Sequence, residues 1–310
     1  MKILIELPSW LGDTVMTTPA IENLVKIIGD AEITLFGSMI SVETLKNHPS
    51  VISTHIVDKN LINLYKTLKC LGHFDIFLSF RGSLRVKLIR LFISAERKYQ
   101  FNTKKYINQH QVEKYNNFVN ESLDIESSPG ALLIYSKNLP KKYSPKLLGI
   151  NPGASYGSSK RWHPREFASV ATYLSKRYDI IIFGGIAEKD IAADIEKYLN
   201  QNGVENYQNL AGKTSISNLI RKIATLDLFI TGDSGPMHLA SALQIPTISI
   251  FGSTNDKETS QWKNDKSFIV KKNLECQPCM KRTCPLHHHD CMSLIKSKDV
   301  VTAVEAIIAH

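Results

Sequence analysis

The sequence of 310 residues contains no long hydrophobic run, and this excludes a membrane-spanning helix. Such a helix needs roughly 20 consecutive apolar residues, and no stretch of the chain approaches that length. The first ten residues, MKILIELPSW, carry Glu6 and Pro8 within a short apolar stretch, which is not the pattern of a signal peptide. We therefore expect a cytoplasmic protein.

Cysteine is also scarce, and five residues in the whole chain are too few for a disulfide scaffold. Four of the five nevertheless lie close together, in the pattern C-x2-C-x4-C-x6-C formed by Cys276, Cys279, Cys284 and Cys291. Four thiols can hold zinc tetrahedrally, but zinc knuckles usually present two close pairs, and the last interval here is wide. We expect reduced thiols and no bound metal.

Two phosphate-binding fingerprints are missing as well. The first strand-like segment is not followed by G-x-G-x-x-G, which disfavours a dehydrogenase, and the chain has no Walker A sequence G-x-x-x-x-G-K-[ST]. The remaining composition is typical of a globular protein, with 43% apolar and 22% charged residues and a formal net charge of +9.

Strand-like and helix-like segments alternate along the chain, which predicts an α/β fold with parallel, doubly wound sheets. The strand-like segments are continuously apolar, as expected where helices cover both faces of a sheet. We expect strands at 2–7, 32–37, 74–80, 147–151, 179–185, 227–232 and 246–252. We expect helices at 19–28, 164–177, 188–200, 215–225 and 236–243. The apolar segment ALLIY (131–135) closes the first half, and 96–128 carries only a weak pattern.

The stretch SKNLPKKYSPK (136–146) is rich in lysine and proline, which is typical of a linker, and it joins the two halves. We therefore predict two Rossmann-like domains facing a central cleft, an N-terminal domain at 1–145 and a C-terminal domain at 146–310. The first domain carries a basic run, because residues 81–105 hold eight lysines and arginines, Arg81 and Arg85 among them, against Glu96 alone. This run is either a solvated helix face or a surface for an anionic partner.

Ligands of doubly wound sheets bind at the carboxyl ends of the strands, so the residues after each strand are the candidates. After strand 2–7, Gly12 permits a tight turn and Asp13 lies in the loop before the first expected helix. An aspartate there commonly caps a helix or turn, and a carboxylate facing a cleft is also well placed as a general base. Spacing alone favours the capping role.

Three strand ends of the second half carry groups suited to a nucleotide diphosphate. The loop NPGASYGSSKRWHP (151–164) offers Lys160 as a point charge for phosphate, or is an ordinary flexible loop. Glu188 begins a helix, where a carboxylate accepts from ribose hydroxyls or only stabilises the helix N-terminus.

The third strand end, DSGPMHLA (233–240), has Pro236 in the first turn of its helix, so free amides and the helix dipole favour an anion there. Asp233, Ser234, Gly235 and His238 surround this helix start. A purely structural role would have Asp233 and Ser234 cap the helix and His238 pack against a strand. The density of phosphate-binding groups favours the functional role.

Several of these segments together resemble the ADP-heptose:lipopolysaccharide heptosyltransferases of glycosyltransferase family 9. The matching segments are LPSWLGDTVMTTPA, NPGASYGSSKRW, LAGKTS, TGDSGPMHLA, FGSTN and CQPCMKRTCPLHHHDCM, in the family's order along nearly the whole chain. The last of them is more like heptosyltransferase II than I. The resemblance implies a GT-B fold and an inverting transfer from ADP-heptose without catalytic metal or other cofactor.

The resemblance also implies roles for individual residues. Asp13 corresponds to the base, and Lys160 would also oppose the charge of the departing ADP. Ser155 and Lys160 match positions at the donor phosphates, Glu188 matches the ribose position, and Asp233, Ser234, Gly235 and His238 match positions at the donor diphosphate and sugar. Tyr156 departs from the hydroxyl residue that some relatives have there.

The implied acceptor is a membrane-anchored lipid A–core oligosaccharide, whose phosphates and carboxylates suit the basic run with Arg81 and Arg85. The basic N-terminal domain would then touch the inner face of the inner membrane. Three alternatives stay open: heptosyltransferase I or another ADP-heptose transferase, a nucleotide-sugar 2-epimerase that acts on the donor alone, and a zinc-knuckle protein that binds nucleic acid. The last lacks the aromatic-interleaved basic motif of such binders, so we expect no nucleic-acid partner.

Overall fold

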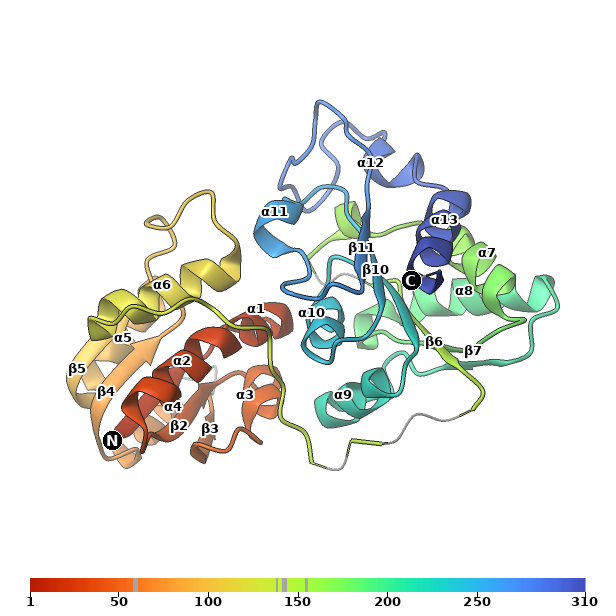
Figure 1. The fold of residues 1–310 in the computed structure, drawn as a ribbon. Coiled ribbons are helices and arrows are strands. Elements are labelled where there is room, and N and C mark those ends of the chain that lie inside the picture. The colour runs from red at the N-terminus through yellow and green to blue at the C-terminus, as the bar shows by residue number, and fades with distance from the viewer. Residues whose placement is uncertain (58–60, 138, 141–143, 154–155, 310) are drawn as a thin grey trace. The chain divides into compact units, whose positions relative to one another are not determined.

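A computed structural model of the chain shows two compact units, Met1–Lys137 (the N-terminal unit) and Asn138–His310 (the C-terminal unit). It describes residues 1–57, 61–137, 139–140, 144–153 and 156–309, without the side chains of 61–63. Each unit contains one parallel sheet with helices packed on it (Figure 1). No helix in these described ranges is long and apolar enough to cross a membrane.

The N-terminal unit is built on a five-stranded sheet in the order β3-β2-β1-β4-β5, and every neighbouring pair is parallel. Helices α4 and α5 pack on one face of this sheet, where Leu64 and Ile89 contact a cluster that includes Leu4 and Phe77. The elements are β1 (Lys2–Glu6), α1 (Leu11–Met16), α2 (Thr18–Ile28), β2 (Glu32–Gly37), α3 (Met39–Leu45), β3 (Val51–Ile56), α4 (Leu61–Cys70), β4 (His73–Ser79), α5 (Leu84–Phe92), β5 (Ser94–Gln100) and α6 (Gln111–Leu123).

The C-terminal unit has a six-stranded parallel sheet in the order β11-β10-β9-β6-β7-β8. Its elements are β6 (Leu147–Asn151), η1 (Ser158–Lys160), α7 (Pro164–Leu174), β7 (Asp179–Ile182), η2 (Ile186–Glu188), α8 (Lys189–Gln201), β8 (Tyr207–Asn209), α9 (Ile216–Ala224), β9 (Leu228–Gly232), α10 (Gly235–Ala242), β10 (Thr247–Ile250), α11 (Asp256–Thr259), β11 (Ser267–Val270), α12 (Asp290–Ser293) and α13 (Ser297–Ile308). Helices α7, α8 and α13 share one hydrophobic cluster with the strands.

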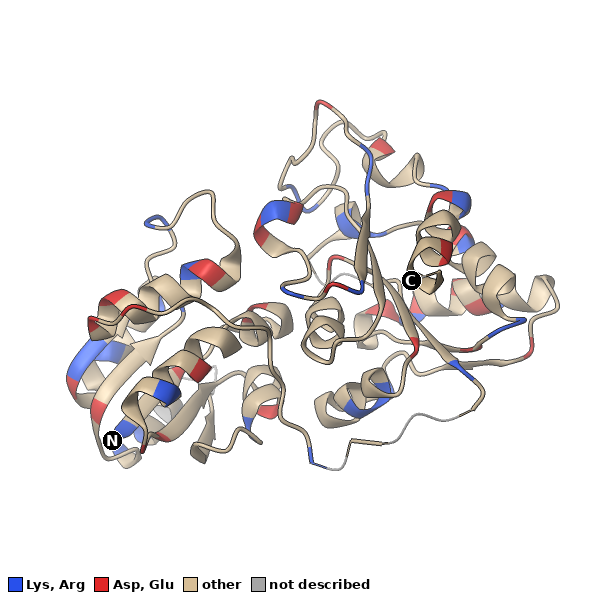
Figure 2. Ribbon diagram, viewed as in Figure 1, with Lys and Arg blue, Asp and Glu red and all other residues tan. Residues whose placement is uncertain are grey.

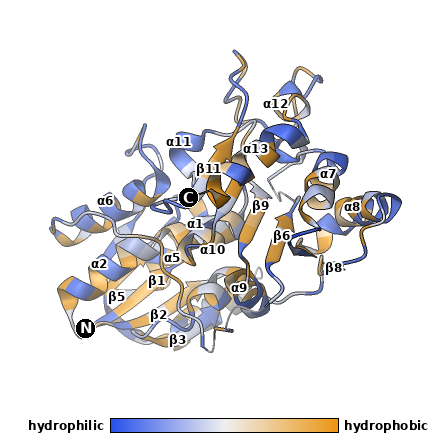
Figure 3. Cartoon of the chain, turned by 45° about the vertical axis from the view of Figure 1, so that its right-hand side comes forward, coloured by the Kyte–Doolittle hydropathy of each residue, from blue (hydrophilic) through white to orange (hydrophobic). Residues whose placement is uncertain are grey.

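Continuous burial of the central strands explains why their sequences do not alternate. Every residue of β9 is buried, and β1 is buried after Lys2, because helices cover both faces. Figure 3 shows the resulting hydrophobic residues along strands such as β6 and β9. The expected strands and helices are therefore present, with boundaries that differ by a few residues.

The apolar segment 131–135 is irregular; Leu132 and Ile134 are buried in it, while Leu133 N donates to Thr18 Oγ1 of α2 at 3.1 Å. One expectation for the N-terminal half was wrong. Asp13 does not lie in a loop before the first helix, because a short helix, α1, already begins at Leu11.

Candidate active site

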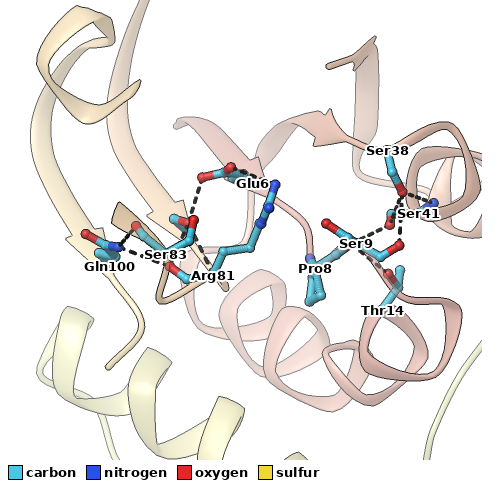
Figure 4. A network of polar contacts seen from close by, with 10 residues as sticks. Glu6, Pro8, Ser9, Thr14, Ser38, Ser41, Arg81, Ser83 and Gln100 are labelled. Atoms are coloured by element: carbon cyan, nitrogen blue, oxygen red, sulfur yellow. Dashed lines mark hydrogen bonds and ion pairs between the residues drawn. The ribbon is translucent and has the colours of Figure 1, made fainter. Parts of the chain in front are cut away.

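Asp13 lies in the first turn of α1, directly after the carboxyl end of β1. Helix α1 is short and contains Gly12, so its own propensity is low, and contacts with the preceding loop hold it. Thr14 Oγ1 donates to the carbonyls of Pro8 at 3.2 Å and Trp10 at 2.9 Å, and Ser41 Oγ of α3 donates to the same Pro8 carbonyl (Figure 4). These bonds fix the backbone from which the half-buried Asp13 side chain projects.

Tyr115 of α6 contacts the Asp13 carboxylate, a partner that the sequence analysis missed. Its hydroxyl donates to Asp13 Oδ1 at 3.3 Å. The ring is 3% exposed and packs against Phe80 and Phe101, with ring centroids 5.3 and 5.0 Å away. Burial, followed by the negative charge of Asp13, raises the pKa of Tyr115 well above 10. The phenol therefore stays protonated and remains a donor to the carboxylate near neutral pH.

A second buried group, Glu6, lies at the carboxyl end of β1 beside the end of β4. Glu6 is fully buried; Ser79 Oγ donates to its Oε2 at 2.7 Å, and Arg81 Nη1 lies 3.5 Å from its Oε1 (Figure 4). Burial raises the pKa of Glu6, while the bond from Ser79 and the charges of Arg81 and Arg85 oppose that rise. Arg81 therefore has a structural partner, which sequence spacing did not indicate.

In the C-terminal unit, the ends of β6 and β9 are joined by a small polar network. Asn151 Nδ2 donates to Thr231 Oγ1 at 3.3 Å and to Ser234 Oγ at 3.2 Å, and the two hydroxyls lie 3.0 Å apart. Ser234 is the residue before α10, but its side chain makes no capping bond to that helix. The simple capping role is therefore wrong for Ser234, whose hydroxyl instead joins two strand ends beside Gly235.

Lys160 and Asp233 form the central charged contact of this unit. Lys160 Nζ lies 2.5 Å from Asp233 Oδ2, and Thr254 Oγ1 donates to the same oxygen at 2.6 Å. The two side chains are 12% and 5% exposed. The Lys160 ammonium also lies 4.6 Å from the ring centroid of Tyr156. The lysine that the sequence predicted at phosphate is thus brought to the start of α10.

Two further positions support this arrangement. Trp162 follows the Lys160 loop, is 1% exposed, and donates its indole N–H to the carbonyl of Ile295 at 2.9 Å, so it anchors the loop. His238 of α10, expected at the donor diphosphate and sugar, is buried and 3% exposed. Ser155, expected at the donor phosphates, lies outside the residues that the structure describes.

Glu188 ends the short helix η2, and its Oε2 accepts from the backbone N–H of Gly185. It also lies against the loop after β6, since a Cβ atom added at Gly153 would be 2.3 Å from Glu188 Cγ. Only glycine allows this approach at 153. The carboxylate therefore stabilises its own turn and borders the loop that leads to Lys160.

The four clustered cysteines line one cavity of about 20 Å³ together with His288 and His289. Burial and the charges of the other three thiols raise the pKa of Cys291 to about 11. Among the residues that the structure describes, no group of three or more His, Cys, Asp or Glu side chains is arranged to hold a metal ion. The expectation of no metal stays a prediction.

Comparison with known proteins identifies the class to which this fold and site belong. Residues 66–289 match the model of glycosyltransferase family 9, described as heptosyltransferase. The chain belongs to this family and is a glycosyltransferase, which confirms the resemblance drawn from its motifs.

Particular relatives are more specific. The lipooligosaccharide heptosyltransferase 2 of Campylobacter jejuni serotype O:2 is 39% identical, with 100% of this chain and 99% of the relative covered. The serotype O:6 protein of the same name is 38% identical over 99% of both chains. The resemblance to type II is therefore confirmed.

Solved structures confirm the fold. The structure of E. coli ADP-heptose lps heptosyltransferase II covers 100% of this chain and 99% of its own, with a TM-score of 0.84 at 20% identity. E. coli heptosyltransferase WaaC with ADP covers 99% of this chain and 100% of its own, with a TM-score of 0.81 at 14% identity. The predicted α/β GT-B fold is correct.

Proposed function

We propose that this protein is a heptosyltransferase II, which moves a heptose from ADP-L-glycero-D-manno-heptose to the first heptose of the lipopolysaccharide inner core. The observation that carries the proposal is the Lys160–Asp233 contact at the start of α10, which brings a cation and a carboxylate together at a helix N-terminus. A diphosphate suits the cation and the helix start, while sugar hydroxyls suit the carboxylate. The full-length type II relatives support the choice of donor and acceptor.

The donor site comprises residues of the C-terminal unit. Lys160, Ser234 and the amides at Gly235 bind the diphosphate, with Ser155 as the further phosphate contact expected from the family. Asp233 and His238 hold the diphosphate–sugar junction, and Glu188 accepts from the ribose hydroxyls. No metal or other cofactor takes part, because the positive charge of Lys160 and the dipole of α10 oppose the charge on the leaving group.

The chemical step is an inverting displacement. Asp13 removes the proton from the acceptor hydroxyl as that oxygen attacks the anomeric carbon of the donor heptose. The new C–O bond forms while the bond from the anomeric carbon to the β-phosphate oxygen breaks, and its electron pair leaves with ADP. The hydrogen bond from Tyr115 orients the Asp13 carboxylate for this proton transfer.

The acceptor is the anionic lipid A–core oligosaccharide, held through the N-terminal unit. Arg81 is 26% exposed and Arg85 is partly exposed, and Figure 2 shows further basic residues along α5. This basic surface attracts the acceptor's phosphates and brings the cytoplasmic enzyme to the inner face of the inner membrane as a peripheral protein. Nucleic acid is not a partner.

A transfer assay tests the proposal. Purified enzyme is incubated with ADP-heptose and either a lipid A–core acceptor without heptose or one that carries a single heptose, and products are identified by mass spectrometry. We expect one heptose to be added to the second acceptor only. Addition to the heptose-free acceptor would make the protein a type I enzyme, and conversion of donor without acceptor would make it an epimerase.

A further inference from the structure

The cysteine segment (residues 276–291) packs against the lysine loop (residues 156–160), although more than a hundred positions separate them in the sequence. Tyr156 Oη donates to the carbonyl of Met280 at 2.8 Å. At Gly157 the approach is so close that an added Cβ atom would lie 2.2 Å from the carbonyl oxygen of Arg282. The cysteine segment is therefore part of the wall beside Lys160, a role that the spacing of its thiols does not reveal.

Ser159 is the centre of this contact, and it is 1% exposed. Its N–H donates to the Arg282 carbonyl at 3.1 Å and its Oγ donates to the Lys281 carbonyl at 2.5 Å. Its own carbonyl accepts from His289 Nε2 at 3.1 Å, and Ser253 Oγ donates to Ser159 Oγ at 3.0 Å. Ser159 precedes Lys160, so these bonds fix the backbone that carries the lysine.

The same segment brings a second cation to the loop. The guanidinium carbon of Arg282 lies 5.5 Å from the centroid of the Tyr156 ring, the ring that the Lys160 ammonium approaches at 4.6 Å. Arg282 is exposed, and no carboxylate among the described side chains lies within ion-pair distance of it. Lys160, by contrast, is already paired with Asp233.

The positive charge at the lysine loop is too small to neutralise a diphosphate unless a further cation contributes. A diphosphate carries more than one negative charge, whereas the charge of Lys160 is largely compensated by the carboxylate 2.5 Å away. A planar guanidinium with several donors binds phosphate oxygens in pairs, and the contact with the Tyr156 ring keeps the Arg282 guanidinium beside the lysine loop.

We propose that Arg282 is a second cation for the diphosphate of the nucleotide donor, positioned by the bonds between the cysteine segment and the lysine loop. This inference rests on the proposed function in one respect, that the donor is a nucleoside diphosphate sugar. It adds the cysteine segment to the donor site.

Calorimetric titration of the full chain with ADP and with AMP tests the proposal. Arg282→Ala removes only the side chain, so the carbonyl contacts of residue 282 with the loop remain. We expect ADP binding to weaken about ten-fold, AMP binding to change less, and Arg282→Lys to restore part of the affinity. The matched control is Lys281→Ala, which removes an exposed cation one position away and should leave ADP affinity within about two-fold.

Two outcomes would overturn the proposal. If Arg282→Ala binds ADP as tightly as the unaltered enzyme, Arg282 is no phosphate ligand, and the proposed function is untouched. If Lys281→Ala weakens ADP binding as much as Arg282→Ala, the effect is one of overall charge and not of a specific contact. Failure of the unaltered enzyme to bind ADP at all would instead refute the proposed donor, and this inference with it.

Discussion

Replacing Lys160 by alanine should affect stability and donor binding together, because the lysine neutralises a carboxylate that is almost completely buried. Asp233 is 5% exposed, and within the described part of the chain its remaining partner would be the hydroxyl of Thr254 at 2.6 Å. Removing one partner of a buried ion pair costs about 3–5 kcal/mol. The remaining hydrogen bond and the 12% exposure of Lys160 place the expected loss at the lower end, about 3 kcal/mol.

A double variant separates the two effects. Lys160→Ala combined with Asp233→Asn removes both charges, and the amide oxygen can still accept from Thr254. We expect this variant to recover about 2 kcal/mol relative to Lys160→Ala, since no buried charge is left without a counter-charge. ADP affinity should stay weak in both variants, because both lack the phosphate-binding cation.

The assay is thermal unfolding followed by circular dichroism, without ligand, together with calorimetry of ADP binding. A loss of 3 kcal/mol corresponds to a melting temperature lower by roughly 6–12 °C for a unit of this size. Arg177→Ala is the matched control, because its ion pair with Glu305 in the same unit is about 40% exposed on both sides and should contribute little to stability. Equal melting temperatures of Lys160→Ala and Arg177→Ala would refute this role of Lys160, and so would a double variant that is no more stable than the single one.

Four further predictions concern the base, its partner and the cysteines. Asp13→Asn should lower turnover by roughly 10²–10⁴-fold with ADP affinity unchanged, and near-normal turnover would make Asp13 a structural residue. Tyr115→Phe should lower kcat about five-fold with ADP affinity unchanged, since the Asp13 carboxylate loses the hydrogen bond that orients it; an unchanged kcat would contradict this role. With its pKa near 11, Cys291 should be the last thiol of the cysteine segment to react with iodoacetamide at pH 8, as peptide mass spectrometry would detect. Enzyme that was never exposed to nickel resin should contain less than one zinc per chain by elemental analysis and should stay active in EDTA. One zinc per chain, together with a loss of thermal stability on chelation, would make the cysteine segment a metal site.

The sequence predicted the two parallel sheets and the helices that cover them well, because strands buried on both faces have continuously apolar sequences. Segments such as 147–151 and 227–232 became β6 and β9 almost residue for residue. Helix α1 was missed because its six residues include a glycine and two β-branched residues and have no helical apolar period. Its stability comes from the bonds of Thr14 to the loop before it, which no local pattern records.

The side-chain partners were less predictable, because they depend on which strands become neighbours. Lys160 and Asp233 are 73 positions apart, and Tyr115 lies 102 positions from Asp13. Each residue could be singled out from its own strand end or helix. The first pairing follows from the adjacency of β6 and β9, and the second follows from the packing of α6 against α1. Ser234 shows the same limit: its sequence context predicts a cap, whereas the neighbouring strand supplies Asn151 as the actual partner.

The cysteine spacing of the cysteine segment does not indicate which of its groups contact the lysine loop. Its four thiols suggest a metal site, yet its hydrogen bonds with the lysine loop are made by the backbone carbonyls of residues 280–282 and by His289. Carbonyl groups occur at every position and so leave no trace in a sequence. The two roles are separable, because chelation acts on the thiols and Arg282→Ala acts on the guanidinium alone. An enzyme that keeps its ADP affinity in EDTA, and whose Arg282→Ala variant binds ADP about ten-fold more weakly, would show that the cysteine segment contributes to the donor site through Arg282 and not through a metal held by its cysteines.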